Sequence, residues 1–393
     1  MVTHSKDIIK YNEIKNVYKR VKGTPITAER MEKIKFVTGA IRVFAGGATE
    51  IRANESDLPN ANIISVPVVI VQSRGVIDFI YCYEPCTFKN EMWGYTSSDV
   101  NAVKFLFYYL KHNVDYFRNA GDGRSSFSQI SLPVTEEYKI PLLSSKEQQA
   151  IVSVLSDFDE HIDNLSELVE KKKAIRNGAL SDLASGRTRV NGFDGDWIES
   201  TVENSTRAII TGGTPSTAID KYWGGTIPWL ASTEVHQKII TKATKNISEI
   251  GLNNSSAKIA PKDSVLIALA GQGKTRGTAA FLAYPMALNQ SLAALVASDE
   301  IDAKFLYYLM ENMYIDLRKL SSGDGGRGGL NKTLIKNINI RIPGEKKEQQ
   351  AIADVLTAMD EEIESLEVEK EKMLQIKEGA MDDLLTGRVR LKI

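Results

Sequence analysis

The chain has 393 residues, which is longer than one ordinary domain, so about two to four folded units are expected. Its 42% hydrophobic and 25% charged residues are typical of a globular protein, and no apolar run approaches the ~20 residues that a membrane-spanning helix needs. A net charge of −1 excludes a uniformly basic nucleic-acid-binding protein, but it leaves room for a local basic surface.

The chain begins with a polar stretch that lacks the apolar core of a signal peptide, which predicts a cytoplasmic location without membrane contact. Residues 1–143 predict a first globule of mixed α/β structure. Short β-branched runs at 63–71 and 76–83 indicate strands, and the amphipathic stretch 101–118 indicates a helix.

The only two cysteines of the chain, Cys82 and Cys86, have a CxxxC spacing. A structural zinc site would need a second pair of ligands, and none follows, so an ordinary cysteine pair at a strand and turn is the favoured interpretation over zinc. We therefore expect no metal ion and no other cofactor.

A long amphipathic segment follows, and it occurs twice. Residues 147–190 and 348–391 align without a gap at an offset of 201, and 21 of the 44 aligned positions are identical. Both copies begin with Glu-Gln-Gln-Ala-Ile and end with Gly-Arg-x-Arg. About 38 uninterrupted residues form a helix roughly 55–60 Å long. A helix of this length extends beyond a single globule and needs another surface for its apolar side. The helix formed by the other copy of the repeat is the expected partner.

Apolar residues in each copy recur in alternating steps of three and four, which predicts two long helices packed as an antiparallel coiled coil. The alternative is a solvated amphipathic helix on its own domain, and the length disfavours it. The predicted seam consists of Ile151, Leu155, Phe158, Ile162, Leu165, Val169, Ile352, Leu356, Met359, Ile363 and Leu366.

A second globule is predicted between the two copies, with a strand at 264–270 and a helix at 302–320. It repeats the first globule faintly, because Lys-Phe-Leu occurs at 104 and 304 and Gly-Asp-Gly at 121 and 323. The predicted fold is α+β with a pseudo-twofold internal repeat. Its parts are globule 1–143, helix 144–190, globule 191–343 and helix 344–393.

The segment Gly-Gln-Gly-Lys-Thr at residues 271–275 is similar to the phosphate-binding loop of an NTPase. That loop needs another glycine where this chain has Ala268, and it must lead into a helix. The following residues 278–284 instead alternate as in a strand, so strand, turn and strand predict a hairpin. The first globule has a matching hairpin at 68–83, with Arg74-Gly75 at the position of Arg276-Gly277.

A basic hairpin tip rich in glycine suits the phosphate backbone of DNA, and arginine also reads guanine in the major groove. The loops 121–127 and 323–332 have the same character, being rich in glycine, basic and polar. A plain solvent-exposed loop is the alternative for each one. Their recurrence at matched positions in both globules favours a function.

Two divergent globules that alternate with two similar helices resemble the specificity subunit of a Type I restriction-modification enzyme over nearly the full length. Further matching motifs are Gly-Gly-Thr-Pro-Ser at 212–216, Ile-Pro-Trp-Leu at 227–230 and the hairpin at 271–277. The second globule opens with the Phe-x-Gly-x-Trp of that family at 193–197, whereas the first opens differently.

The resemblance implies a fold of two target recognition domains, each of which reads one half of a split double-stranded DNA sequence. It implies that the paired helices set the spacer between the halves and bind two methyltransferase subunits, which restriction subunits then join. It also implies a subunit without catalysis. No S-adenosylmethionine loop, Asn-Pro-Pro-Tyr/Phe motif or helicase motif is present. The Gly-Arg-x-Arg ends of the helices are candidate docking residues.

The candidate DNA-binding residues are polar, basic or aromatic residues of the expected loops. In the first globule they are Arg42, Arg74, Lys89, Trp93, Arg124 and Ser125, and in the second they are Thr214, Ser216, Trp229, Thr233, Lys274, Thr275, Arg276, Arg327, Asn331 and Lys332. Both tryptophans have a core position as their alternative. An NTPase dependent on Lys274 and a pure coiled-coil assembly scaffold are the alternative functions.

Overall fold

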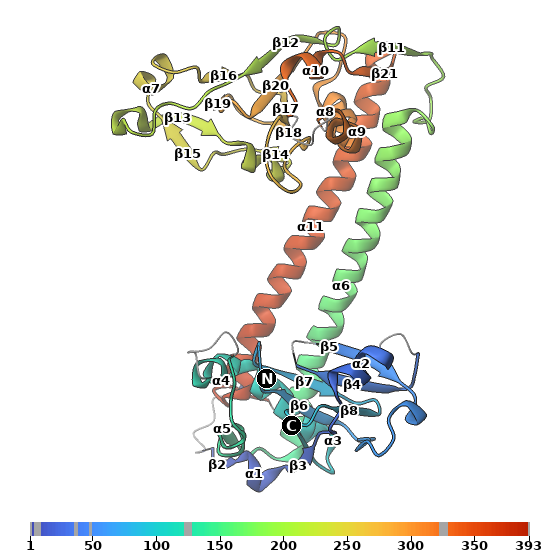
Figure 1. The fold of residues 1–393 in the computed structure, drawn as a ribbon, viewed down its shortest axis with the longest axis vertical. Helices are drawn as coiled ribbons and strands as arrows, with labels where there is room; N and C mark the ends of the chain where they lie inside the picture. The colour runs from blue at the N-terminus through green and yellow to red at the C-terminus, as the bar shows by residue number, and fades with distance from the viewer. Residues whose placement is uncertain are drawn as a thin grey trace. The chain divides into compact units, whose positions relative to one another are not determined.

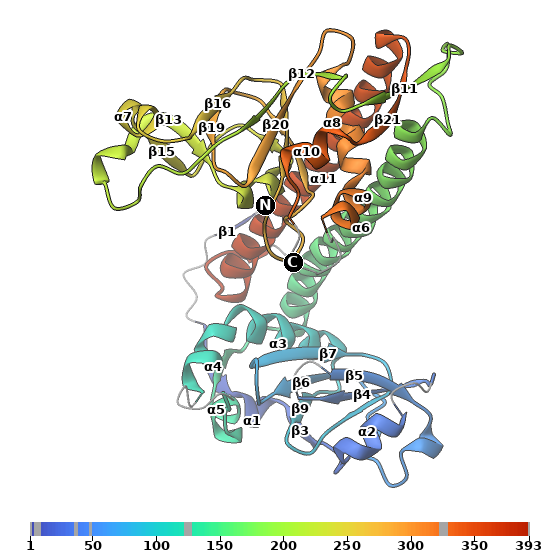
Figure 2. The same cartoon turned by 45° about the horizontal axis from the view of Figure 1, so that its top comes forward.

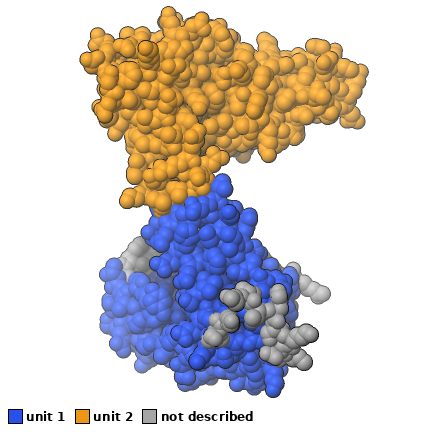
Figure 3. All heavy atoms as spheres, turned by 180° about the vertical axis from the view of Figure 1, so that it is seen from behind, with its two compact units in different colours: residues 1–167, 367–393 blue, residues 168–366 orange. Residues whose placement is uncertain are grey.

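The computed structural model describes residues 9–34, 38–46, 49–121, 128–321 and 329–391, and the backbone of residues 2–3. The chain forms two compact units (Figure 3). Unit 1 consists of residues 1–167 and 367–393, and unit 2 consists of residues 168–366. Each unit therefore contains part of both long helices, so the compact units do not divide at the ends of the predicted helical segments.

Unit 2 is built on a five-stranded sheet in the order β12-β20-β17-β18-β14 (Figure 1). Its strands are β12 (Thr206–Thr211), β14 (Ile239–Ile240), β17 (Ser264–Ala268), β18 (Ala279–Leu282) and β20 (Leu292–Ala297). A second sheet, β15-β13-β19-β16, comprises β13 (Trp223–Leu230), β15 (Lys245–Ile247), β16 (Lys258–Ala260) and β19 (Met286–Leu288).

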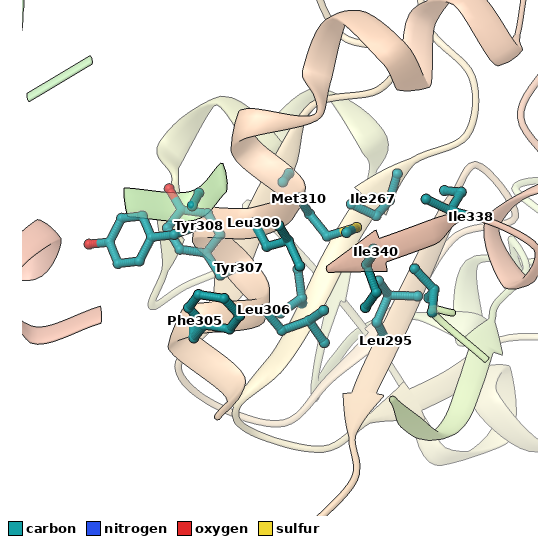
Figure 4. Close-up of a cluster of buried hydrophobic side chains, with 14 of the residues drawn as sticks. Ile267, Leu295, Phe305, Leu306, Tyr307, Tyr308, Leu309, Met310, Ile338 and Ile340 are labelled. Carbon is teal, nitrogen blue, oxygen red and sulfur yellow. The ribbon is translucent and has the colours of Figure 1, made fainter. Parts of the chain in front are cut away.

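The main core of unit 2 lies between the five-stranded sheet and the helix α8 (Ala303–Asn312). Buried side chains of α8 face Ile267 and Leu295 of the sheet, and Ile340 of β21 (Asn339–Pro343) packs beside them (Figure 4). β17 is buried at every position: four of its five residues are apolar, and the hydroxyl of its first residue, Ser264, donates to the carbonyl of Pro261 at 2.7 Å.

Unit 1 has the same plan with fewer strands. Its main sheet has the order β3-β9-β6-β7, and the helix α3 (Val100–His112) packs on β6 and β7 (Figure 2). These strands are β3 (Lys19–Lys22), β6 (Val68–Gln72), β7 (Asp78–Cys82) and β9 (Trp93–Thr96). A smaller sheet, β5-β4-β8, comprises β4 (Ile41–Ala45), β5 (Thr49–Ala53) and β8 (Cys86–Phe88).

The helices predicted at 101–118 and 302–320 are each two helices, so that part of the prediction is wrong. α3 is followed after Asn113 by α4 (Val114–Ala120), and α8 is followed after Met313 by α9 (Tyr314–Leu320). The ψ angles of Asn113 and Met313 are 17° and 8°, away from helical values, which ends the helix while the apolar periodicity continues. Both first helices begin at an aspartate cap, Asp99 or Asp302.

The opening of the first globule, which the sequence left open, has two strands: β1 (Val2–Thr3), which pairs with β22 (Arg390–Leu391), and then β2 (Tyr11–Glu13). β2 pairs antiparallel with β10 (Lys139–Pro141), with Tyr11 opposite Pro141. In unit 2, β11 (Trp197–Thr201) pairs with β21 in the same way, and Trp197 lies opposite Pro343. Tyr11 thus occupies the place of the family tryptophan.

The two repeats form the long helices α6 (Ser145–Ser185) and α11 (Lys346–Leu385). Within unit 2, Arg176 and Lys172 of α6 pair with Asp360 and Glu362 of α11, so the residue numbers run in opposite directions. Within unit 1, Asp159 pairs with Lys377. The helices are therefore antiparallel, as predicted.

The ion pairs follow the internal repeat. Arg176 and Lys377 are equivalent at the offset of 201, and their partners Asp360 and Asp159 are equivalent too. Each aspartate also accepts a hydrogen bond from a tyrosine of its unit, Tyr308 at 2.9 Å or Tyr108 at 2.6 Å. Both repeats thus fasten their helix pair to the adjacent globule with the same three-residue arrangement.

The predicted seam has two parts. Ile151 and Leu155 lie in the core of unit 1, and Ile352 and Leu356 lie in the core of unit 2 with Met359 packed against it, so these residues fix each helix start to its globule. Further along, Ile162, Leu165, Val169 and Ile363 are buried, whereas Phe158 and Leu366 are half-buried.

The Gly-Arg-x-Arg ends were expected to face a partner, but the structure shows internal contacts. Arg189 donates two hydrogen bonds to the buried Glu348, one of 2.7 Å, and Arg390 donates one to the half-buried Glu147. The first arginine of each motif pairs with an aspartate of its own helix end: Arg187 with Asp182, and Arg388 with Asp382 and Asp383. These contacts fasten the ends of the repeats, and the docking role of the four arginines stays a prediction.

No helix in the described part of the chain combines the length and the apolar character needed to cross a bilayer.

Candidate nucleic-acid interface

The stretch around Gly-Gln-Gly-Lys-Thr is the tip of a β-hairpin, as predicted. β17 and β18 pair antiparallel from Ser264 opposite Leu282 to Ile267 opposite Ala279. β18 follows the glycine-rich turn where a phosphate-binding loop would require a helix. The alternative interpretation as an NTPase loop is therefore wrong.

The tip of this hairpin is held from behind by α9. Arg318 donates a hydrogen bond to the carbonyl of Gly273 at 2.7 Å, and the Tyr314 hydroxyl donates one to the carbonyl of Lys274 at 3.1 Å. The buried Thr275 shares a hydrogen bond with His236 at 3.0 Å. The tip is thus a fixed turn, and the Lys274 side chain leaves it into solvent.

The loops that carry the unit 2 candidates leave the same end of the five-stranded sheet. Thr211 at the end of β12 lies opposite Ala293, and Ala268 at the end of β17 lies opposite Leu292. The segments 212–216, 269–278 and 289–291 consequently emerge side by side. Backbone hydrogen bonds to Leu269 from Leu330 and between Leu269 and Ser291 join these loops.

The remaining unit 2 candidates reach the same place. Arg276 contacts the Ser321 hydroxyl at 3.4 Å, immediately before the loop 322–328. Thr233 is exposed on the 3-10 helix η3 (Ser232–Gln237), which follows β13 beside the turn at Asn289. Asn331 caps the helix α10 (Lys332–Lys336) through Leu334, and Lys332 is exposed.

Close backbone packing fixes the segment Gly-Gly-Thr-Pro-Ser. A Cβ on Gly212 would lie 1.8 Å from the carbonyl oxygen of Leu288, so only glycine fits there. The backbone of Gly213 donates to that same carbonyl, and the indole of Trp229 donates to the Gly213 carbonyl at 3.0 Å. This packing leaves Thr214 and Ser216 exposed.

Trp229 is 6% exposed and belongs to a hydrophobic cluster, so its side chain supports the loop and is not proposed as a DNA contact. Trp93 is half-buried against the core of unit 1, and its indole donates to the Thr135 hydroxyl at 2.9 Å. For both tryptophans the structure favours the core alternative.

In unit 1 the matching hairpin is also present, with β6 and β7 paired from Val68 opposite Cys82 to Gln72 opposite Asp78. Arg74 is exposed at its tip, and Gly75 has a φ of 76°, close to the 83° of Gly277. Each hairpin turn is also held by an arginine of the second helix: Arg118 donates to the carbonyl of Ile77, after Arg74-Gly75, and Arg318 donates to that of Gly273, before Arg276-Gly277. The equivalence of the two hairpins is therefore structural.

Lys89 lies near this tip, because the Ser73 hydroxyl donates to the carbonyl of Glu91, and Glu91 in turn pairs with Lys89 at 3.3 Å. Arg124, Ser125 and Arg327 lie outside the described residues. The described residues that follow them in the sequence contact the hairpins: the backbone of Gly75 donates to Ser128, and that of Leu330 donates to Leu269.

Arg42 is not brought to the hairpin tip. It lies on β4 beside the Cys82–Cys86 turn, where it pairs with Glu50 at 2.7 Å and with Glu84 at 3.6 Å. The hydrogen bond to Glu50 raises the pKa of the Arg42 guanidinium, while Glu50 has a lowered pKa for the same reason. This ion pair satisfies Arg42 within the fold, so we do not propose it for DNA contact.

Cys82 and Cys86 are both buried free thiols. A hydrogen bond between the two lowers the pKa of Cys82 to about 7 and raises that of Cys86. In the described part of the chain, no group of three or more His, Cys, Asp or Glu side chains could hold a metal ion.

One element of the unit 1 site was not predicted from the sequence. Gly-Thr-Pro recurs at residues 23–25, and a Cβ on Gly23 would lie 2.6 Å from the carbonyl oxygen of Phe88. The backbone of Thr24 donates to that carbonyl, as Gly213 does to Leu288. The sequence did contain a signal for this element, because the tripeptide Gly-Thr-Pro recurs 190 positions later. That offset differs from the 201 positions that separate the two long helices, so the alignment of the helices does not bring the two tripeptides together.

Unpredicted basic residues lie on the second sheet of unit 2 and its connections. Lys245 is exposed, and its ammonium lies 5.8 Å from the ring centre of the half-buried Trp223. On this sheet and its connections, the exposed lysines that form no ion pair within the described residues are Lys221, Lys242, Lys245 and Lys258. Of these, Lys245 lies near Ser216, because the carbonyl of Ser216 accepts the hydrogen bond of the Trp223 indole.

The chain is similar to known proteins over most of its length. Residues 8–174 and 206–375 match the family model of the Type I restriction modification DNA specificity domain. The MjaVIII specificity subunit of Methanocaldococcus jannaschii is 26% identical over 314 residues, which cover 73% of this chain and 70% of the relative. The EcoR124I/EcoR124II specificity subunit of Escherichia coli is 22% identical over 270 residues, 67% of this chain and 65% of the relative.

Solved structures show the same fold. The crystal structure of the Type I restriction-modification system S subunit from M. genitalium has a TM-score of 0.65 and 17% identity, over 97% of this chain and 96% of that one. A chain from a study of complex assembly and conformational transition of the type I R-M system has a TM-score of 0.58 and 14% identity, over 96% and 97%.

Proposed function

Because the chain belongs to the family of Type I restriction-modification DNA specificity subunits, we propose that each globule of this chain reads one half of a bipartite double-stranded DNA target. The family recognises DNA and leaves catalysis to other subunits. This chain accordingly supplies recognition to a complex with two methyltransferase subunits, which restriction subunits join.

One observation carries the proposal: both units present a hairpin tip with Arg-Gly, fixed from behind by an equivalent arginine, Arg118 or Arg318. In unit 2, exposed hydroxyl and basic side chains gather around the tip from separate loops. Hydroxyl and ammonium groups suit phosphate oxygens, and guanidinium and amide groups suit base edges. A pure coiled-coil scaffold would have no use for this paired arrangement.

The methyltransferase contact is proposed for the exposed faces of the long helices. Ile175 is 50% exposed and its equivalent Ile376 is 43% exposed. Val368 and Leu374 of α11 are exposed as well. Exposed apolar side chains on otherwise charged helices are typical of an interaction surface. Ile175 and Ile376 occupy equivalent positions in the two repeats, so each repeat could bind one copy of the same partner.

The long helices are proposed to set the spacer between the two half-sites. α6 and α11 have 41 and 40 residues without a break, and buried seam residues and ion pairs join them within each unit. Half-sites on one face of B-DNA lie roughly 34 Å apart, the distance of one helical turn. Stiff helices of fixed length would select one such separation.

Inserting one heptad into both helices tests this proposal. Seven residues add about 10.5 Å to each helix, or roughly three base pairs, so the preferred spacer is expected to lengthen while both half-sites stay the same. The measurement is a map of methylated sites for the complex of this chain with its methyltransferase. Altered half-sites at the original spacing would contradict the role of the helices.

Lys274→Ala tests the hairpin tip. Lys274 is exposed, and within the described residues it has no ion pair, so a phosphate contact is its expected use. The variant complex should bind all duplexes more weakly, and the slope of log affinity against log salt should fall by about one unit. Lys262→Ala, at the opposite end of β17, is the matched control. An unchanged salt slope for the Lys274 variant would remove the tip from the interface.

A further inference from the structure

Both units place a side-chain amide at the same exposed turn of the interface. In unit 1 this turn follows β8, and the backbone of Lys89 donates to the carbonyl of Phe44 at 3.0 Å. In unit 2 it follows β19, and the backbone of Asn289 donates to Leu230 at 3.0 Å. The next residues are Asn90 and Gln290, and both are exposed.

The turn that carries Gln290 is fixed on both sides. The buried Asn289 accepts a hydrogen bond from the backbone of Ser291 at 3.0 Å through its side chain. Ser291 in turn accepts one from Leu269 at the base of the hairpin. Gln290 therefore leaves a rigid turn at the point where the hairpin and the segment 212–216 meet.

Thr214 orients the amide of Gln290. Its hydroxyl donates to Oε1 of Gln290 at 2.7 Å, and Thr214 itself belongs to the segment that Gly212, Gly213 and Trp229 hold in place. This bond uses one lone pair of Oε1, so one lone pair and both N–H groups of the amide are left for a ligand. A glutamine that only faced solvent would gain nothing from such support.

A side-chain amide with one acceptor and a donor side by side matches the major-groove edge of adenine, which offers N7 as acceptor and N6 as donor. We propose that Gln290 reads an adenine in the half-site of unit 2, that Thr214 is its positioning residue, and that Asn90 has the corresponding role in unit 1. This inference rests on the proposed function, since it assigns a base-reading residue to each recognition unit.

The test is a map of methylated sites for the complex of the full chain with its methyltransferase. Gln290→Ala should lose the preference for adenine at one position of one half-site, with a roughly 5- to 150-fold loss of discrimination, because a good bidentate contact contributes about 1–3 kcal/mol. Gln290→Glu should shift the preference at that position to cytosine, whose N4 is a donor. Asn90→Ala should change the other half-site.

Thr214→Val should relax the same position as Gln290→Ala, and Thr214→Ser, which keeps the hydroxyl, should restore it. Unchanged half-sites in both Gln290 variants would overturn the inference, and so would a uniform loss of binding without a change in sequence preference. A failure of the proposed function would look different, since the unmodified chain would then give no bipartite site. Thermal unfolding of each variant separates a folding defect from a change of specificity.

Discussion

Replacing Arg176 by alanine is expected to lower the free energy of unfolding of unit 2 by about 3–5 kcal/mol. Arg176 is 3% exposed and donates two hydrogen bonds to Glu311, at 3.0 and 2.6 Å, and one to Asp360 at 2.9 Å. Burial opposes its charge, but the hydrogen bonds to these carboxylates raise its pKa above the ordinary value. Its removal leaves the largely buried Glu311 without a basic partner among the described residues, and it leaves Asp360 with only Lys238, at 3.9 Å.

Denaturant titration followed by tryptophan fluorescence is the measurement, because three of the four tryptophans, Trp197, Trp223 and Trp229, lie in unit 2. The matched control is Lys377→Ala in unit 1. Lys377 is 19% exposed and pairs with Asp159 alone among the described residues, so a smaller loss is expected. An Arg176 variant as stable as the unmodified chain would show that α6 is not fastened to unit 2 by this cluster.

The sequence predicted the elements whose signal is local. The alternating steps from Ile151 to Val169 gave the first long helix, and the β-branched run 264–270 gave a strand of the unit 2 hairpin. The breaks at Asn113 and Met313 escaped prediction because the apolar periodicity continues across them. The internal pairing of Arg189 with Glu348 joins residues 159 positions apart, a distance over which a single sequence carries no periodic signal.

The candidate site was predicted in part for the same reason. Glycine-rich and basic loops such as the tip at Lys274 can be recognised from their amino-acid composition alone. Their convergence depends on strand order and register, which bring Thr211, Ala268 and Leu292 to one sheet end. Gln290 has no local pattern, so only its hydrogen bond with Thr214 reveals it. The ion pairs of Arg42 with Glu50 and Glu84 of neighbouring segments likewise leave no local pattern in the sequence.

Gly212→Ala should destabilise unit 2 by at least about 3 kcal/mol and weaken DNA binding at the same time. The added Cβ would lie 1.8 Å from the oxygen and 2.4 Å from the carbon of the Leu288 carbonyl, and both are backbone atoms that cannot rotate away. The segment 212–216 must therefore move off β19. That movement breaks the hydrogen bond from Gly213 to Leu288 and displaces Thr214 from Gln290.

Gly329→Ala is the control for this variant, since its Cβ would lie 3.7 Å from the Leu269 carbonyl oxygen, an ordinary contact in the same group of loops. Unfolding by denaturant measures the loss of stability, and binding of the complex to its cognate duplex measures the displacement of the loop. If Gly212→Ala lost stability but bound its cognate duplex with unchanged affinity, the segment 212–216 would be a structural brace only. A loss of both stability and DNA affinity would place Thr214 and its neighbours at the DNA. The clash of the added Cβ with the Leu288 carbonyl changes the position of these residues only through the backbone.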